Sequence, residues 1–132
     1  RGVKDCGGDM AKTRALNTDV RLQVLAGEDH QLFVTVAEGG AGAIAASAHV
    51  QTRRFVQVLR LLAEQRLDEA RAEWQPLLPL IEMLFAEPNP GPLKALLAQH
   101  GAMNDALRLP MTRASATLRE RLVALEAGLS RR

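Results

Sequence analysis

The sequence has few of the residues on which many sites depend: among its 132 residues there is no tyrosine, one tryptophan and one cysteine. One cysteine cannot form a disulfide within the chain, so we expect a reducing, cytoplasmic setting. No apolar run reaches the roughly 18 residues that a membrane-spanning helix needs, so we expect no membrane partner. The 17 basic residues are interleaved with 15 acidic ones and lack aromatic neighbours, which argues against nucleic acid as a partner.

Patterns typical of metal and nucleotide sites are also missing. The three histidines, His30, His49 and His100, are far apart, and the chain has no Cys-x2-Cys or His-x3-His pair, so we predict no metal site. The glycines have neither the Walker-type nor the dinucleotide-binding spacing, and we expect no cofactor. For Cys6 we expect a small buried thiol and not a nucleophile.

What the sequence does contain is an α/β alternation in its first half. Apolar segments at 2–3, 20–25 and 41–46 are typical of strands, and each is followed by a short turn of glycine or small residues and then by a helix. This order predicts three parallel strands with right-handed crossovers. The turns would place backbone N–H groups along one edge, suited to a carboxylate or carbonyl oxygen, or they serve only as connections.

Lys4 ends the first predicted strand, which we expect to be buried. A lysine in this position can form an imine with a carbonyl substrate if burial favours its neutral amine. The alternative is a solvated surface lysine beside Asp5.

The second half is predicted to be helical. One helix begins at Leu67, carries apolar residues as far as Phe85, and is broken or kinked by Pro76 and Pro79. A proline-rich turn at 87–92 precedes further predicted elements: a helix at 93–100 ended by Gly101, an extended segment at 107–110, and a last helix from 115 or 117 to 127 capped by Gly128.

Two segments of this half carry a resemblance to a known family. The residues from Glu87 to Lys94 read Glu-Pro-Asn-Pro-Gly-Pro-Leu-Lys, and 107–111 read Leu-Arg-Leu-Pro-Met. Together they resemble the C-terminal helical region of the dihydrodipicolinate synthases. In the same register, segments of the first half match the family's lysine-bearing strand, its turn and the next two strand ends: Gly2-Val3-Lys4-Asp5, Gly8-Asp9, Gly27-Glu28-Asp29 and Gly42-Ala43-Ile44.

The resemblance implies the C-terminal portion of a (β/α)8 TIM barrel at 1–65, with about three parallel strands, followed by a C-terminal helical region at 66–132. It implies a class I, imine-forming lyase in which Lys4 condenses with pyruvate to form a Schiff base. The enamine would then attack aspartate semialdehyde on the route to diaminopimelate and lysine. The backbone at Gly27 and Ile44 would line the pyruvate pocket, with no metal and no cofactor.

Three departures from the family pattern affect this reading. Gly7 stands where the family commonly has a hydroxyl residue, and Ala-Ala-Ser-Ala-His at 45–49 replaces a more polar segment that ends in asparagine. The family's catalytic tyrosines and threonine lie on earlier strands, and this chain has no tyrosine at all. We therefore expect the C-terminal part of such an enzyme, inactive alone, that forms a homo-oligomer or associates with the N-terminal part. Two alternatives stay open: another pyruvate aldolase or lyase of the superfamily, and a non-catalytic truncated assembly protein.

Overall fold

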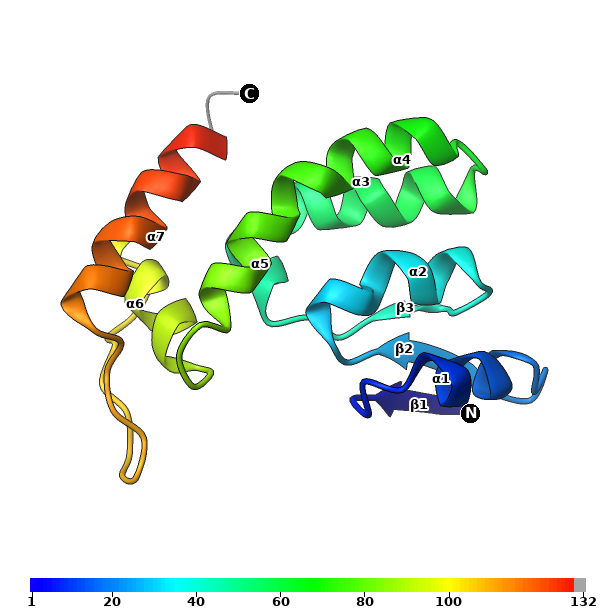
Figure 1. The fold of residues 1–132 in the computed structure, drawn as a ribbon, viewed down its shortest axis with the longest axis horizontal. Coiled ribbons are helices and arrows are strands. Elements are labelled where there is room, and N and C mark those ends of the chain that lie inside the picture. The colour runs from blue at the N-terminus through cyan, green and yellow to red at the C-terminus, as the bar shows by residue number, and fades with distance from the viewer. Residues whose placement is uncertain (130–132) are drawn as a thin grey trace. The chain divides into compact units, whose positions relative to one another are not determined.

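The computed structural model describes residues 1–129, which form two compact units (Figure 1). The N-terminal unit is Arg1–Gln75, and the C-terminal unit begins at Pro76. The predicted boundary between the barrel part and the helical region, at residue 65, stays a prediction. The boundary between the two compact units lies later in the chain, after Gln75. No helix in the described part of the chain has the length and apolar character needed to span a membrane.

The N-terminal unit contains a three-stranded parallel sheet, as predicted. Its strands are β1 (Gly2–Asp5), β2 (Gln23–Ala26) and β3 (Gly42–Ala43), in the order β1-β2-β3. Lys4 pairs in register with Leu25, and Leu25 pairs with Gly42. Because the strands are parallel, their carboxyl ends meet at one edge of the sheet.

The second and third strands are shorter than the sequence suggested. Val20, predicted to begin a strand, lies in the preceding turn with 97% of its side chain exposed. At this exposure the side chain gains almost nothing from burial, so its apolar character alone did not make this position part of the sheet. The third strand keeps only two of the six residues predicted for it.

Helices cover this sheet in successive layers. Helix α2 packs on β2 and β3, α3 packs on α2, and α3 lies beside α4 (Figure 1). Asp9 caps α1, because its carboxylate accepts hydrogen bonds from the amides of Ala11 and Lys12 at 2.9 and 3.2 Å. The bounds of the helices, with short 3-10 turns as η, are α1 (Met10–Asn17), η1 (Asp29–Gln31), α2 (Leu32–Ala37), η2 (Ser47–His49), α3 (Thr52–Ala63) and α4 (Leu67–Trp74).

The core of this unit is mainly aliphatic and contains one cluster of three aromatic side chains. Trp74 stacks on Phe33 with ring centroids 5.9 Å apart and meets Phe55 edge-on at 6.1 Å. Other core side chains are almost fully buried: Val24, Leu32, Val58 and Leu61.

The C-terminal unit is built from α5 (Leu78–Leu84), α6 (Gly91–Gln99) and α7 (Ala116–Leu129). The turn η3 (Gln75–Leu77), which contains Pro76, separates α4 from α5 and confirms the predicted break. Helix α7 packs on both α5 and α6. The buried side chains of this unit include Leu80, Ile81, Leu84, Leu96, Leu118 and Leu122.

Two predicted ends in this unit have different outcomes. Gly101 has a φ of +70° and follows α6, as predicted for a C-terminal glycine. The predicted cap at Gly128 is wrong, since α7 continues through Leu129. Leu129 is buried, with 6% exposure, and burial of this side chain favours continuation of the helix past the glycine.

The proline-rich segment from Glu87 to Lys94 forms hydrogen bonds with the chain that precedes α7. The amide of Ser115 donates a 2.9 Å hydrogen bond to Glu87 Oε2, and Lys94 Nζ donates to the carbonyl oxygen of Ala106. The extended segment predicted at 107–110 is wrong at its end: the amide of Met111 closes a turn on the carbonyl of Arg108 at 3.1 Å. The intervening Leu109 is 89% exposed, so no packing holds it extended.

Candidate functional site

Lys4 lies at the carboxyl end of β1, with its side chain exposed. The predicted burial of this strand is wrong, because Gly2 is exposed and Val3 only half-buried. The reason is topological: β1 is an edge strand and has a neighbour on one side only. Lys4 is therefore at the carboxyl ends of the strands, as expected, but its side chain is in contact with water.

Gly27 directly follows β2 and lies against the lysine. An ideal Cβ at Gly27 would stand 2.9 Å from Lys4 Cε and 2.8 Å from the carbonyl oxygen of Asp5, and it would also collide with Cys6 Sγ. Contacts this short do not occur for real side chains, and the backbone oxygen of Asp5 cannot move aside as the flexible stem of Lys4 can, so the close approach of the two strand ends at this point requires glycine. The structure thus brings together two of the three residues predicted for the site.

Ile44 is the third predicted residue and follows β3 at the same edge. Its amide donates a 2.9 Å hydrogen bond to the carbonyl of Ala26, the residue before Gly27. Its side chain is 52% exposed. The three strand ends that carry Lys4, Gly27 and Ile44 are therefore neighbours, although the roles of these residues stay a prediction.

Asp5 is a buried carboxylate that was not predicted from the sequence as a site residue. It is 7% exposed and accepts hydrogen bonds from Thr13 Oγ1 at 2.6 Å and from the amide of Gly7 at 3.1 Å. It also forms an ion pair with Lys12. The bond from Lys12, and then that from Thr13, lowers the pKa of Asp5 below its ordinary value of 3.8.

Asp29 is a second buried carboxylate behind this edge, and it too was missed. It is 3% exposed and accepts hydrogen bonds from the amides of Ala46 and Ser47 at 3.1 and 2.6 Å. These bonds fix the turn that follows Ile44. The only signal in the sequence was an acid at the start of the helix after Gly27, a position that is more often a solvated N-terminal residue.

The remaining candidates offer less chemistry. The expected burial of Cys6 is wrong: it follows the last residue of the edge strand β1 and is exposed. Within residues 1–129 no group of three or more histidine, cysteine and acidic side chains is placed to hold a metal ion.

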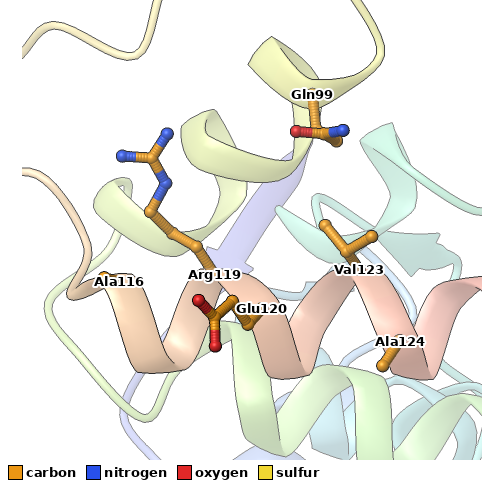
Figure 2. Close-up of a pocket in the computed structure, with 6 residues that line it drawn as sticks. All are labelled: Gln99, Ala116, Arg119, Glu120, Val123 and Ala124. Carbon is orange, nitrogen blue, oxygen red and sulfur yellow. The ribbon is translucent and has the colours of Figure 1, made fainter.

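An open groove of about 490 Å³ lies on the C-terminal unit (Figure 2). Figure 2 shows Gln99 of α6 facing side chains of α7, among them Arg119 and Val123. The guanidinium of Arg119 also lies 3.4 Å from Asp105. None of the predicted site residues lines this groove, and we assign it no role in the chemistry at Lys4.

Comparison with known proteins extends over nearly the whole chain. The model of the family described as "Dihydrodipicolinate synthetase family" matches residues 1–127. The 4-hydroxy-tetrahydrodipicolinate synthase 2 of Clostridium acetobutylicum is 38% identical over 124 residues, which cover 92% of this chain and 43% of the relative.

Solved structures agree with this match. The dihydrodipicolinate synthase of Thermotoga maritima superposes with a TM-score of 0.92 at 28% identity, covering 98% of this chain and 45% of that one. A chloride-inhibited dihydrodipicolinate synthase of Acinetobacter baumannii, complexed with pyruvate, superposes with a TM-score of 0.88 at 27% identity, covering 96% and 45%. The chain therefore spans less than half the length of these relatives.

Proposed function

The chain belongs to the dihydrodipicolinate synthetase family, and from this premise we propose that it supplies the imine-forming lysine of a pyruvate-dependent lyase. In this proposal Lys4 is the catalytic residue, and the backbone at Gly27 and Ile44 lines the pyruvate site. The relative from Acinetobacter baumannii, which was crystallised with pyruvate, supports pyruvate as the first substrate.

The observation that carries this proposal is the contact between Lys4 and Gly27. The lysine stem lies against a residue that has no side chain, at the carboxyl ends of parallel strands. In (β/α)8 barrels this edge holds the catalytic residues, which come from the ends of several strands. A lysine there is placed to meet a small carbonyl compound bound over the neighbouring strand ends.

The proposed chemistry uses the lysine as a nucleophile. The neutral amine of Lys4 attacks the keto carbon of pyruvate, water leaves, and the resulting imine draws electrons from the adjacent methyl carbon. Loss of a proton from that carbon gives an enamine, which attacks the aldehyde carbon of aspartate semialdehyde. Attack on the imine carbon by water, or by the amino group of the semialdehyde, then breaks the bond to Lys4 and returns the free amine. The product belongs to the route to diaminopimelate and lysine.

Imine formation needs an uncharged amine, and exclusion of water favours that form. Lys4 is exposed on the edge strand β1, so the proposal requires that other residues shield its amine from water. We infer that further barrel strands, from the rest of the same protein or from another chain, pair with β1 and enclose the amine. Homo-oligomer formation and a cytoplasmic location likewise stay predictions.

A second candidate keeps the lysine and changes the acceptor. Ala45 and Ala46 follow Ile44 and present methyl groups where the family has a more polar segment. Methyl groups cannot hydrogen-bond a polar aldehyde, which favours a superfamily member that acts on another aldehyde or keto acid. Competition between aspartate semialdehyde and other aldehydes, measured as pyruvate consumption, separates the two candidates.

Borohydride trapping tests the lysine directly. The protein produced from its own gene is incubated with pyruvate and borohydride, digested, and analysed by peptide mass spectrometry. We expect one reduced pyruvate adduct, on Lys4, which Lys4→Arg abolishes and the matched variant Lys94→Arg retains. No adduct, or an adduct on Lys12 or Lys94, would overturn the proposal and favour a non-catalytic assembly protein.

A further inference from the structure

We propose that Asp5 is a positioning residue that sets the direction in which Lys4 leaves the sheet. This inference rests on the proposed function of Lys4. Asp5 itself does not touch the substrate in this proposal: it acts by holding the end of β1 against helix α1.

Neighbouring residues of a strand project to opposite faces of the sheet. Lys4 and Asp5 therefore leave β1 in opposite directions, and their surroundings differ accordingly. The side chain of Asp5 is 5% exposed, whereas that of Lys4 is exposed. Two of the partners of Asp5, Lys12 and Thr13, belong to α1, so the carboxylate faces the helix side of the sheet.

The carboxylate of Asp5 joins three segments at once. Its Oδ2 binds the hydroxyl of Thr13 on the helix, and its Oδ1 binds both the amide of Gly7 in the turn and the ammonium of Lys12. Thr13 is itself buried, with 2% exposure. A buried carboxylate needs such partners, since one left without them is strongly destabilising.

The main chain of Asp5 carries this restraint to the lysine. Its carbonyl oxygen accepts a 2.7 Å hydrogen bond from the amide of Gly27, and Gly27 is the residue on which the stem of Lys4 lies. Asp5 is thus held on one side by α1 and on the other by the end of β2. Rotation of Asp5 would turn the peptide bond that joins it to Lys4 and move the amine away from Gly27.

A second ion pair on α1 provides a matched comparison. Arg14 donates three hydrogen bonds of 2.8 to 3.0 Å to the carboxylate of Glu38. This pair is on the same helix as Lys12 and Thr13, but it joins α1 to the end of α2. Its loss removes a charge pair from the helix without touching β1.

The experiment compares reductive trapping of Lys4 by pyruvate in the protein from its own gene and in four variants. The variants are Asp5→Asn, Asp5→Glu, Lys12→Gln and Glu38→Gln. Trapping rates are measured against pyruvate concentration, with melting temperatures alongside. A displaced amine loses the geometry for attack, so we expect Asp5→Asn to lower the maximal rate by about ten- to a hundredfold. The pyruvate concentration at half-maximal rate should stay unchanged.

The other variants separate positioning from general stability. Lys12→Gln should lower the maximal rate in the same direction but by less, and Asp5→Glu should recover part of the rate lost in Asp5→Asn. Glu38→Gln should trap at the wild-type rate even where its melting temperature falls as far as that of Asp5→Asn. A purely structural carboxylate would give no such difference at equal loss of stability.

The inference is overturned if Asp5→Asn traps at the wild-type rate, or if Glu38→Gln loses as much as Asp5→Asn. If Asp5→Asn does not fold, Lys12→Gln decides, because the Lys12 side chain is 45% exposed and its replacement opens no buried cavity. A wild-type protein without an adduct on Lys4 would instead refute the proposed function. An adduct that neither Asp5→Asn nor Lys12→Gln slows would refute the positioning role alone.

Discussion

The amide of Gly27 donates a 2.7 Å hydrogen bond to the carbonyl oxygen of Asp5, and this bond joins the end of β2 to the strand that carries Lys4. The two chain segments approach so closely here that a single added carbon atom has no room. The contact is thus a sensitive point at which to test the site.

Replacement of Gly27 by alanine should damage both the fold and the chemistry. The new methyl group would stand 2.8 Å from the backbone oxygen of Asp5, which cannot move as a flexible side chain can. We expect a loss of about 1–3 kcal/mol in the free energy of unfolding and at least a roughly tenfold slower trapping of Lys4 by pyruvate.

Gly2→Ala is the matched control for this change. Its added carbon would lie 3.8 Å from the nearest atom, the carbonyl oxygen of Gln23, which is an ordinary contact. Urea denaturation and the trapping rate should both stay near wild type. Equal behaviour of the two alanine variants would contradict the role given to Gly27.

Replacement of Asp29 by alanine should loosen the turn after Ile44. The amides of Ala46 and Ser47 would lose their acceptor, and a buried group left unsatisfied costs about 1–3 kcal/mol. We expect the N-terminal unit to lose about 2–4 kcal/mol in free energy of unfolding. Trp74, the one tryptophan of the chain, belongs to this unit and reports its unfolding by fluorescence.

Asp68→Ala tests whether any lost carboxylate has this effect. The Asp68 side chain is 96% exposed, and its partner is Arg71 at 2.9 Å. An exposed pair of this kind contributes about 0–1 kcal/mol. A loss in Asp68→Ala as large as that in Asp29→Ala would count against a specific role for Asp29.

The same substitution at two glycines of the C-terminal unit should act with opposite sign. Gly128 lies inside α7, and no atom lies within 4 Å of its added carbon, so Gly128→Ala should stabilise the helix by about 0.5–1 kcal/mol. Gly101 also has open space, but its φ of +70° disfavours any side chain, so Gly101→Ala should cost about 1–2 kcal/mol. Thermal unfolding followed by circular dichroism measures both. Shifts of equal sign would be the contrary result.

Asp5 should make stability depend on pH in the acid range. Its folded-state pKa is below the ordinary 3.8, chiefly because of the bonds from Lys12 and Thr13. The stability that the Asp5 carboxylate provides is therefore fully present above pH 3.8 and is lost as pH falls through the folded-state pKa. In urea denaturation, the difference between wild type and Asp5→Asn should shrink below pH 3.8. A difference that is constant down to strong acid would contradict the lowered pKa.

The alternation of apolar segments with glycine turns was enough to predict the three parallel strands and the helices between them. Proline at position 76 likewise located the break before α5. Burial was harder to predict. Val3 has the side chain of a core residue, but β1 is at the edge of the sheet, and the sequence of a strand does not state how many neighbours it has.

The α/β alternation was enough to predict that the strand ends carrying Lys4, Gly27 and Ile44 meet at one edge of the sheet. The choice of Gly27 and Ile44 as pocket residues came from the family resemblance, and the roles of all three residues stay predictions. Asp5 and Asp29 were missed because their partners are distant: Thr13 is eight residues from Asp5, and Ala46 is 17 residues from Asp29. An acid beside a glycine turn is typically solvated, and only the folded chain shows that these two are not.

The proline-rich segment from Glu87 to Lys94, which resembles the family most specifically, belongs to the C-terminal unit, whereas Lys4 and Gly27 belong to the N-terminal unit. The residues proposed for the chemistry and this segment are therefore in different compact units of the chain. A match to the proline-rich segment alone carries no information about the residue at position 4, so only an assay at that lysine reports whether the chain can form the imine.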